Sequence, residues 1–206
     1  NQNFTIDMSG LDVDISNHYY VDVLFSDGND SMKVSLSGLY ENPLFESIYH
    51  YDGELGAIYT KDKTTFKVWS PHAEEMTLLL YNNPHNKYDS EGNVKLERGA
   101  YKVVKMTRGD KGVFMTTVND DLHGKYYLYE SVVNGEKERF VDPYAKSVGP
   151  NGERGMIVSF EELNPSGWVY DTRPDTVKNH TDYILYETHI KDLTTHPSWN
   201  GPEEMR

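Results

Sequence analysis

The stretch Phe66-Lys67-Val68-Trp69-Ser70-Pro71, followed by the apolar run from Met76 to Tyr81, decides the fold class of this chain. In the first stretch, apolar residues alternate with Lys67, which predicts a strand with one face in water that stops at the proline. The second stretch is densely apolar, as expected of a strand that is buried on both faces. Together they predict a protein built on sheets.

The same period of two continues on both sides of this stretch. We expect strands where Met32, Val34 and Leu36 alternate with polar residues, over 113–117 and over 126–133, and the first of these should have one wet face. Asn134-Gly135 predicts a tight hairpin turn, because both residues tolerate positive φ. Before residue 160 we find no convincing amphipathic helix, and after it a single turn around 161–163. The fold predicted for the middle of the chain is an all-β sandwich.

Composition excludes several classes of function. The 206 residues carry 20 Lys and Arg against 33 Asp and Glu, a net charge of −13, which opposes binding to nucleic acid or to anionic membranes. No Cys is present, so thiol catalysis and Cys-ligated metal sites are excluded, while the cellular compartment stays open. No apolar run approaches the roughly 20 residues that a membrane-spanning helix needs.

Signatures of catalysis are missing from the sequence. It has no Gly-rich phosphate loop, no GxSxG elbow and no HExxH motif. His189, Asp192 and His196 share no strand or helix face, so we predict no metal site there. Glu187 and Asp192 lie near the end of a predicted strand, but a structural role is favoured over a catalytic one for Glu187. We therefore expect no catalytic residue, no metal ligand and no cofactor in this chain.

Aromatic rings are the remaining candidates for a binding function. A flat ring covers the apolar face of a pyranose, while amide and carboxylate groups bind its hydroxyls. Five rings stand outside the obvious alternation and are our candidates for carbohydrate binding, although packing in a core is the alternative for each of them: Trp69, Tyr81, Tyr88, Trp168 and Trp199.

Composition shifts suggest three parts. A break near Asn42-Pro43 and an irregular stretch from Asn164 to Thr181 divide the chain into a small β module over 1–48, a sandwich over 49–163 and a third part over 164–206. The apolar run over 183–190 reads as the first strand of a new fold. About 25 residues after 181 cannot form a core alone, so we expect the chain to continue into a larger domain.

Several motifs, in one order along the chain, resemble a known family. The block Tyr51-Asp52-Gly53-Glu54-Leu55-Gly56-Ala57-Ile58-Tyr59-Thr60, together with the stretch ending Trp69-Ser70-Pro71, is similar to the immunoglobulin-like carbohydrate-binding module of family 48 that precedes the catalytic barrel of type I pullulanases, with Ser70 in place of the usual Ala. Four later segments extend the resemblance, the last with Lys191 and Leu193 as mild departures: 121–127, 141–147, 151–155 and 186–193.

This resemblance implies a part of a retaining glycoside hydrolase that cleaves α-1,6 linkages in pullulan, starch or glycogen fragments. It implies an incomplete (β/α)₈ barrel after the sandwich, with the catalytic Asp and Glu downstream and none in this chain. The implied partners are an α-glucan and the remaining catalytic-domain polypeptide. This sequence contains no Asp-x-Asp-x-Asp-Gly pattern, so it does not support the structural calcium ion that is conceivable for the whole enzyme. Alternatives are a free-standing starch- or glycogen-binding module, a structural surface domain, and the corresponding part of isoamylase or of a glycogen branching enzyme.

Overall fold

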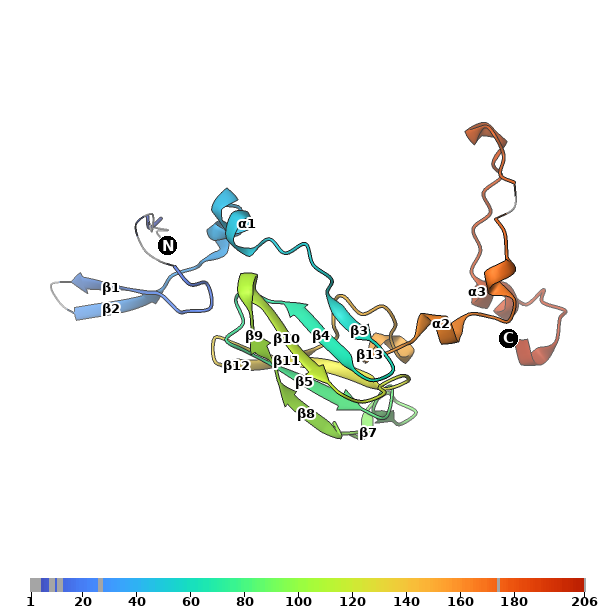
Figure 1. Ribbon diagram of the computed structural model, residues 1–206, viewed down its shortest axis with the longest axis horizontal. Coiled ribbons are helices and arrows are strands. Elements are labelled where there is room, and N and C mark those ends of the chain that lie inside the picture. Colours follow the sequence, from blue (N-terminus) through green and yellow to red (C-terminus); the bar gives the residue numbers. More distant parts are fainter. Residues whose placement is uncertain (1–4, 8–9, 11–12, 26–27, 174, 206) are drawn as a thin grey trace. The chain divides into compact units, whose positions relative to one another are not determined.

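The computed structural model describes residues 5–7, 10, 13–25, 28–173 and 175–205 (Figure 1). Contacts divide the chain into two compact units, Asn1–Asn164 and Pro165–Arg206. The strands all lie in the first unit: β1 Tyr20–Phe25, β2 Gly28–Lys33, β3 Gly56–Tyr59, β4 Thr64–Trp69, β5 Glu75–Tyr81, β6 Lys87–Tyr88, β7 Val94–Leu96, β8 Lys102–Lys105, β9 Thr107–Arg108, β10 Val113–Val118, β11 Tyr126–Val133, β12 Glu136–Phe140 and β13 Gly155–Met156.

Two antiparallel sheets form a sandwich. One sheet has the order β3-β4-β10-β9, and the other has the order β12-β11-β5-β8, with β13 added along β11. Buried side chains from both sheets make one core, in which the rings of Phe66 and Tyr127 meet edge to face with centroids 5.2 Å apart. The predicted sandwich is therefore confirmed.

The two stretches that predicted the fold form central strands. In β4 burial alternates residue by residue, with Phe66 and Val68 inside. In β5 all residues from Leu78 to Tyr81 are buried, because this strand lies between β11 and β8 and carries the core on one face. Burying one such side chain stabilises the fold by about 1.5–3 kcal/mol, so these strands anchor the sandwich.

The predicted hairpin turn joins β11 to β12. Val133 pairs with Glu136, and the two residues between them, Asn134 and Gly135, have φ of 58° and 72°. Positive φ at both turn positions matches the right-handed twist of the strands, which explains the Asn-Gly sequence. β6 and β7 form a smaller hairpin, in which residues 89–93 connect the two strands.

The prediction that no helix precedes residue 160 was wrong. The helix α1 spans Pro43–Tyr49, where we expected none. The Asn42 side chain accepts a hydrogen bond from the Leu44 amide at 2.9 Å, and the proline at the first helical position completes the start signal. With seven residues, α1 is too short to show a helical period, and it is held by the packing of Phe45 against Trp69.

The strand over residues 32–36 also differs from expectation. β2 ends at Lys33, so Val34 and Leu36 lie beyond it, and all its residues are exposed. The prediction that one face of this strand is buried was wrong, because within the described part of the chain β2 pairs with β1 alone and no second sheet packs on this pair. The short 3₁₀ helices η1 Ser37–Leu39, η2 Asp110–Gly112 and η3 Pro150–Gly152 complete the first unit, with the predicted single turn present as α2, Phe160–Leu163.

The second unit contains short helical elements. These are η4 Trp168–Tyr170, η5 His180–Asp182, α3 Ile190–Thr195 and η6 Glu203–Met205. Residues 183–189 belong to no strand. A strand forms hydrogen bonds with a neighbouring strand, and the described residues place none beside this segment. The barrel strand therefore stays a prediction. Among the described residues, no helix combines the length and the apolar character that crossing a bilayer would take.

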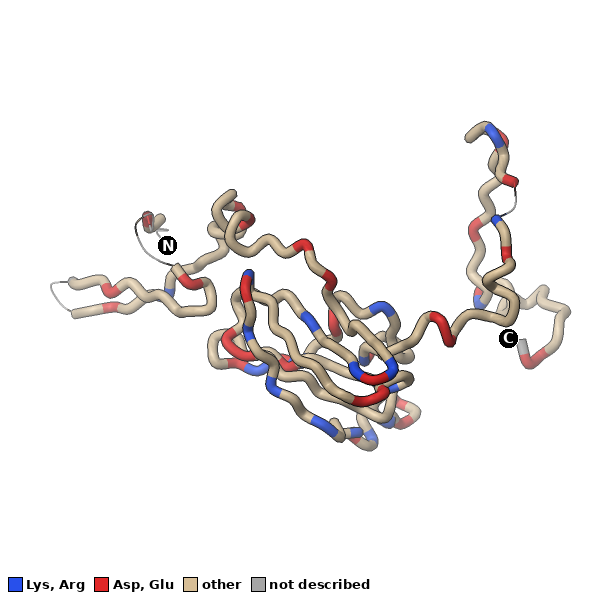
Figure 2. The backbone as a smooth tube through the Cα atoms, viewed as in Figure 1, with Lys and Arg blue, Asp and Glu red and all other residues tan. Residues whose placement is uncertain are grey.

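Acidic and basic residues are interspersed along the backbone of the sandwich (Figure 2). Lys105 pairs with Glu75 at 2.7 Å and Arg139 with Glu130 at 2.8 Å, for example. Because opposite charges alternate on this surface, they do not build the field of a single sign that attracts a charged polymer.

Candidate functional site

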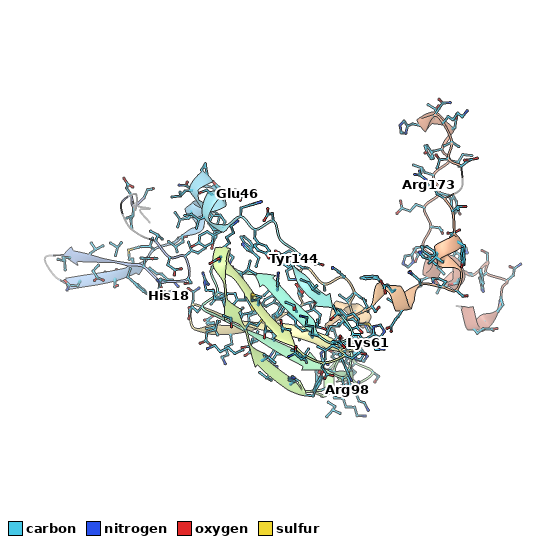
Figure 3. The ribbon with its side chains drawn as sticks, viewed as in Figure 1. His18, Glu46, Lys61, Arg98, Tyr144 and Arg173 are labelled. Atoms are coloured by element: carbon cyan, nitrogen blue, oxygen red, sulfur yellow. The ribbon has the colours of Figure 1, made fainter. Side chains whose placement is uncertain are left out.

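The most organised polar cluster lies where β5 ends at Tyr81. The loop over 82–86, the β6–β7 hairpin and the residues that follow η3 come together at this end of the sandwich, where Figure 3 labels Arg98. Arg154 joins them: its Nη1 donates to the Asn83 carbonyl at 2.7 Å, and its Nη2 donates to the Asn86 Oδ1 and to the Arg98 carbonyl, both at 2.9 Å. Segments that are far apart in sequence therefore share one guanidinium.

Tyr81 lies beneath that guanidinium. The Arg154 Cζ is 3.8 Å from the centroid of the Tyr81 ring, a close cation–π contact. Only 4% of Tyr81 is exposed, and burial raises the pKa of its hydroxyl. Since Arg154 covers the ring and the core holds the rest, Tyr81 has no free face on which a sugar could stack.

Tyr88 is the exposed ring of the cluster. It is 39% exposed, and its hydroxyl donates to the Glu153 Oε2 at 2.6 Å, which raises the pKa of Tyr88. The His85 ring lies nearly parallel to it, with centroids 6.1 Å apart and planes at 23°. His85 Nδ1 faces the Asn86 carbonyl, which only accepts, so in the neutral ring Nε2 is the acceptor.

These groups have the chemistry of a sugar-binding surface. The Tyr88 and His85 rings offer flat apolar area, and the Glu153 carboxylate and the His85 Nε2 accept hydrogen bonds from hydroxyl groups. The cluster carries no paired carboxylates at the spacing of a glycosidase, which in a retaining enzyme is about 5 Å. Its geometry fits binding.

Trp69 has a different environment. Its indole Nε1 donates to the Tyr49 carbonyl at 2.9 Å, and its ring meets Phe45 edge to face with centroids 6.4 Å apart. Both partners belong to α1, so the half-buried Trp69 ties that helix to the end of β4. The structure does not join Trp69 to the Tyr88 cluster.

The other two candidates belong to the second unit. Trp168 is largely exposed and lines a shallow hollow together with Tyr170. Trp199 is half-buried, and its Nε1 donates to the Pro202 carbonyl at 3.3 Å. Of the five predicted rings, the structure thus brings Tyr81 and Tyr88 to one place and leaves both tryptophans of the second unit as separate candidates.

The sequence analysis missed three members of the cluster: His85, Glu153 and Arg154. Glu153 and Arg154 lie in a segment, 151–155, that was noticed only as part of a family resemblance. No local signal shows that an arginine will be buried against a tyrosine of another strand, because that contact depends on the tertiary fold. The only local signal in the loop over 82–86 was that two polar residues that can bind hydroxyl groups, His85 and Asn86, follow the end of a predicted strand.

Comparison with known proteins places the sandwich in a family. Residues 54–145 match carbohydrate-binding module 48, the isoamylase N-terminal domain, a range that includes Tyr81 and Tyr88. The chain is 34% identical over 163 residues to a pullulanase of Bacillus subtilis (strain 168), in a match that covers 79% of this chain and 20% of that protein. It spans from 13% to 20% of the length of the curated relatives it matches.

Solved structures agree with this match. A pullulanase from Anoxybacillus sp. LM18-11 in complex with maltotriose has a TM-score of 0.67 and 33% identity, covering 90% of this chain and 24% of that one. A pullulanase from Paenibacillus barengoltzii in complex with maltohexaose and α-cyclodextrin has a TM-score of 0.64 and 34% identity, covering 76% of this chain and 22% of that one.

Proposed function

We propose that this chain, which is an N-terminal pullulanase segment with a carbohydrate-binding module 48, serves a retaining glycoside hydrolase that cleaves α-1,6-glucosidic branch linkages in pullulan, starch or glycogen fragments. Support comes from the relatives, which are pullulanases and include structures with maltooligosaccharides. The catalytic carboxylates then belong to polypeptide beyond this chain. We also propose that the chain is divided into three parts, over 1–48, 49–163 and 164–206.

Within that enzyme, the sandwich holds α-glucan at Tyr88. The single observation that carries this role is the exposed Tyr88 ring, fixed by its hydrogen bond to Glu153 and flanked by His85. A glucose ring stacks on Tyr88, and its hydroxyls donate to the Glu153 carboxylate and to the His85 Nε2. Trp168 is the second candidate, because its ring is also exposed.

The second unit has a different role, which is packing on the rest of the enzyme. Ile184 and Leu185 are 96% and 92% exposed, and Tyr186 beside them is largely exposed too. A row of large apolar side chains in water marks an interaction surface. We assign it to the remaining catalytic-domain polypeptide, in which residues 183–190 form the first strand of a (β/α)₈ barrel.

Binding to insoluble starch and to maltohexaose tests the glucan role of the sandwich. We expect Tyr88→Ala to weaken the maltohexaose affinity by about tenfold, equivalent to about 1.4 kcal/mol of lost stacking and hydrogen bonding. Tyr20→Ala removes an exposed tyrosine from β1, which takes no part in the cluster, and serves as the matched control. Unchanged affinity in Tyr88→Ala, with the fold intact, would exclude Tyr88 as the contact.

The whole enzyme requires its own test. The full-length protein should release reducing ends from pullulan but not from linear amylose, and the first product should keep the α configuration at its anomeric carbon. Inverted product would contradict the retaining mechanism, and cleavage of amylose alone would contradict the α-1,6 assignment. A chain that binds starch while the full-length protein cleaves neither glucan would favour a free-standing binding module.

A further inference from the structure

Arg154 is a buried cation with no described carboxylate at ion-pair distance, although the charge of the neighbouring Glu153 acts on it from farther away. It is 4% exposed, and the ion pairs formed by the described residues do not include it. Burial of a charge is costly unless hydrogen bonds compensate for it, and burial indeed lowers the pKa of this guanidinium. An arginine retains its charge at any physiological pH. The three hydrogen bonds of Arg154 to oxygen atoms therefore have to offset the lost hydration.

Those hydrogen bonds have a defined geometric effect. The acceptors are the Asn83 carbonyl and the Asn86 Oδ1, on either side of His85, and the Arg98 carbonyl after the β6–β7 hairpin. The hairpin that carries Tyr88 is thus fixed at both of its ends by one side chain. A lysine ammonium, which is a compact charge on a flexible stem, does not reproduce the planar fork that reaches three oxygens.

Tyr81 fixes the plane of that fork. It is the last residue of β5 and pairs with Tyr126 of β11, so its ring is anchored in the sheet. The guanidinium lies over the ring, with its Cζ 3.8 Å from the centroid. A chain of contacts therefore runs from the sheet through Tyr81 and Arg154 to both ends of the hairpin, and through the backbone to Glu153, the partner of Tyr88.

We infer that Arg154 and Tyr81 are positioning residues, which hold Tyr88 and Glu153 in the arrangement that binds α-glucan without touching the glucan themselves. This inference rests on the proposed glucan-binding function for its ligand, while the positioning of Tyr88 does not depend on any ligand. It reassigns Tyr81, a predicted sugar-stacking ring, to a supporting role, because Arg154 occupies the place that a sugar would take.

Three variants of the chain test the inference. Arg154→Lys keeps the charge but loses the fork, Tyr81→Leu removes the ring, and Tyr81→Phe retains a ring for the guanidinium. Arg173→Lys is the matched control, because it makes the same change at an exposed arginine of the second unit. Thermal unfolding of every variant shows whether the sandwich itself remains folded.

The first measurement needs no ligand. The hydrogen bond to Glu153 raises the pKa of Tyr88, so this pKa, followed by NMR of the ring, reports whether the two side chains still meet. In Arg154→Lys and Tyr81→Leu it should fall toward the ordinary tyrosine value of about 10. In Tyr81→Phe and Arg173→Lys it should stay raised, and Glu153→Ala, which has no side-chain acceptor, provides the value for the broken contact. A Tyr88 pKa that stays raised in Arg154→Lys would overturn the inference.

The second measurement is the dissociation constant for maltohexaose. We expect it to rise about tenfold in Arg154→Lys and in Tyr81→Leu, and to stay within about twofold of the parent in Tyr81→Phe and Arg173→Lys. If the parent chain does not bind maltohexaose, the glucan-binding proposal fails, and the inferred positioning of Tyr88 is judged by its pKa alone. If Arg154→Lys lowers the Tyr88 pKa but leaves the affinity unchanged, the positioning role in glucan binding is refuted.

Discussion

Replacing Tyr127 by Phe should destabilise the sandwich by an amount that depends on pH. Tyr127 is fully buried, and its hydroxyl donates to the Oδ2 of Asp142 at 2.7 Å. Asp142 is only 3% exposed, and its Oδ1 accepts from the Tyr144 amide at 2.8 Å. The substitution removes one of two hydrogen bonds from a buried carboxyl and leaves the ring that packs on Phe66 in place.

The magnitude follows from the charge of the acceptor. A hydrogen bond to an ionised group contributes about 1.5–3 kcal/mol, and one between neutral groups contributes about 0.5–1.5 kcal/mol. We therefore expect Tyr127→Phe to lower the free energy of unfolding by about 2 kcal/mol where Asp142 is ionised and by about 1 kcal/mol where it is protonated. For a unit of this size, Asn1–Asn164, about 2 kcal/mol corresponds to a fall in Tm of about 4–8 °C.

The sign of the pH dependence follows from the pKa of Asp142. Burial raises this pKa above its ordinary value, and the hydrogen bonds from Tyr127 and Tyr144 oppose the rise only in part. The stability that this group contributes is thus fully present below its unfolded pKa and is lost as the pH rises through its folded pKa. Without the Tyr127 hydroxyl, the pKa of Asp142 in the folded state rises further. The free energy of unfolding should therefore fall more with rising pH in the variant than in the parent.

Urea unfolding followed by circular dichroism between pH 4 and pH 8 measures these changes. The m-value should stay constant, because the surface exposed on unfolding is the same. Tyr101→Phe, at an exposed tyrosine, is the control, and in an Asp142→Asn background the cost of Tyr127→Phe should stay near 1 kcal/mol at every pH. An equal cost at both ends of the pH range, or a larger one in acid, would refute the reasoning.

Three further substitutions test local features. The Ser159 amide donates to His123 Nδ1 at 2.9 Å, and His123→Ala removes this acceptor. If the hydrogen bond contributes about 1 kcal/mol to local stability, hydrogen exchange at the Ser159 amide should accelerate about fivefold. Trp69→Phe leaves the Tyr49 carbonyl without its indole donor, so thermal unfolding should show a loss of about 0.5–1.5 kcal/mol. Gly112→Ala, at φ +74° and with a new Cβ 2.4 Å from a proline Cα, should lose at least about 1–3 kcal/mol in urea unfolding.

The glycine and histidine predictions each have a control in the same chain. Gly99→Ala meets no atom within 4 Å, so its free energy of unfolding should change by less than about 0.5 kcal/mol. Equal losses in both glycine variants would contradict the steric argument at Gly112. In the histidine variant the neighbouring Gly124 amide, which donates to a backbone carbonyl, should exchange as before. An unchanged unfolding temperature in Trp69→Phe would show that the indole hydrogen bond does not stabilise α1.

The central strands β4, β5, β10 and β11 were predictable because local pattern and final environment agree. Alternation around Phe66 and Val68 anticipates the two faces of β4, and the Asn134-Gly135 pair anticipates a turn with two positive φ values. Where local pattern and environment diverge, prediction was wrong. The alternation around Met32 finds no layer to cover it, and α1 is too short for its period to be visible.

The amino-acid pattern was enough to predict a sandwich in the middle of the chain and to place the turn at Asn134-Gly135. Those properties are local, since they depend on the period and the backbone preference of neighbouring residues, whereas the likeness to carbohydrate-binding module 48 came from a comparison of motifs. Which tyrosine ring stays exposed depends instead on contacts between segments that are distant in the sequence. Tyr81 and Tyr88 are the same residue type at two strand ends, but Arg154, from the far end of the sandwich sequence, covers the first and holds the second open to water.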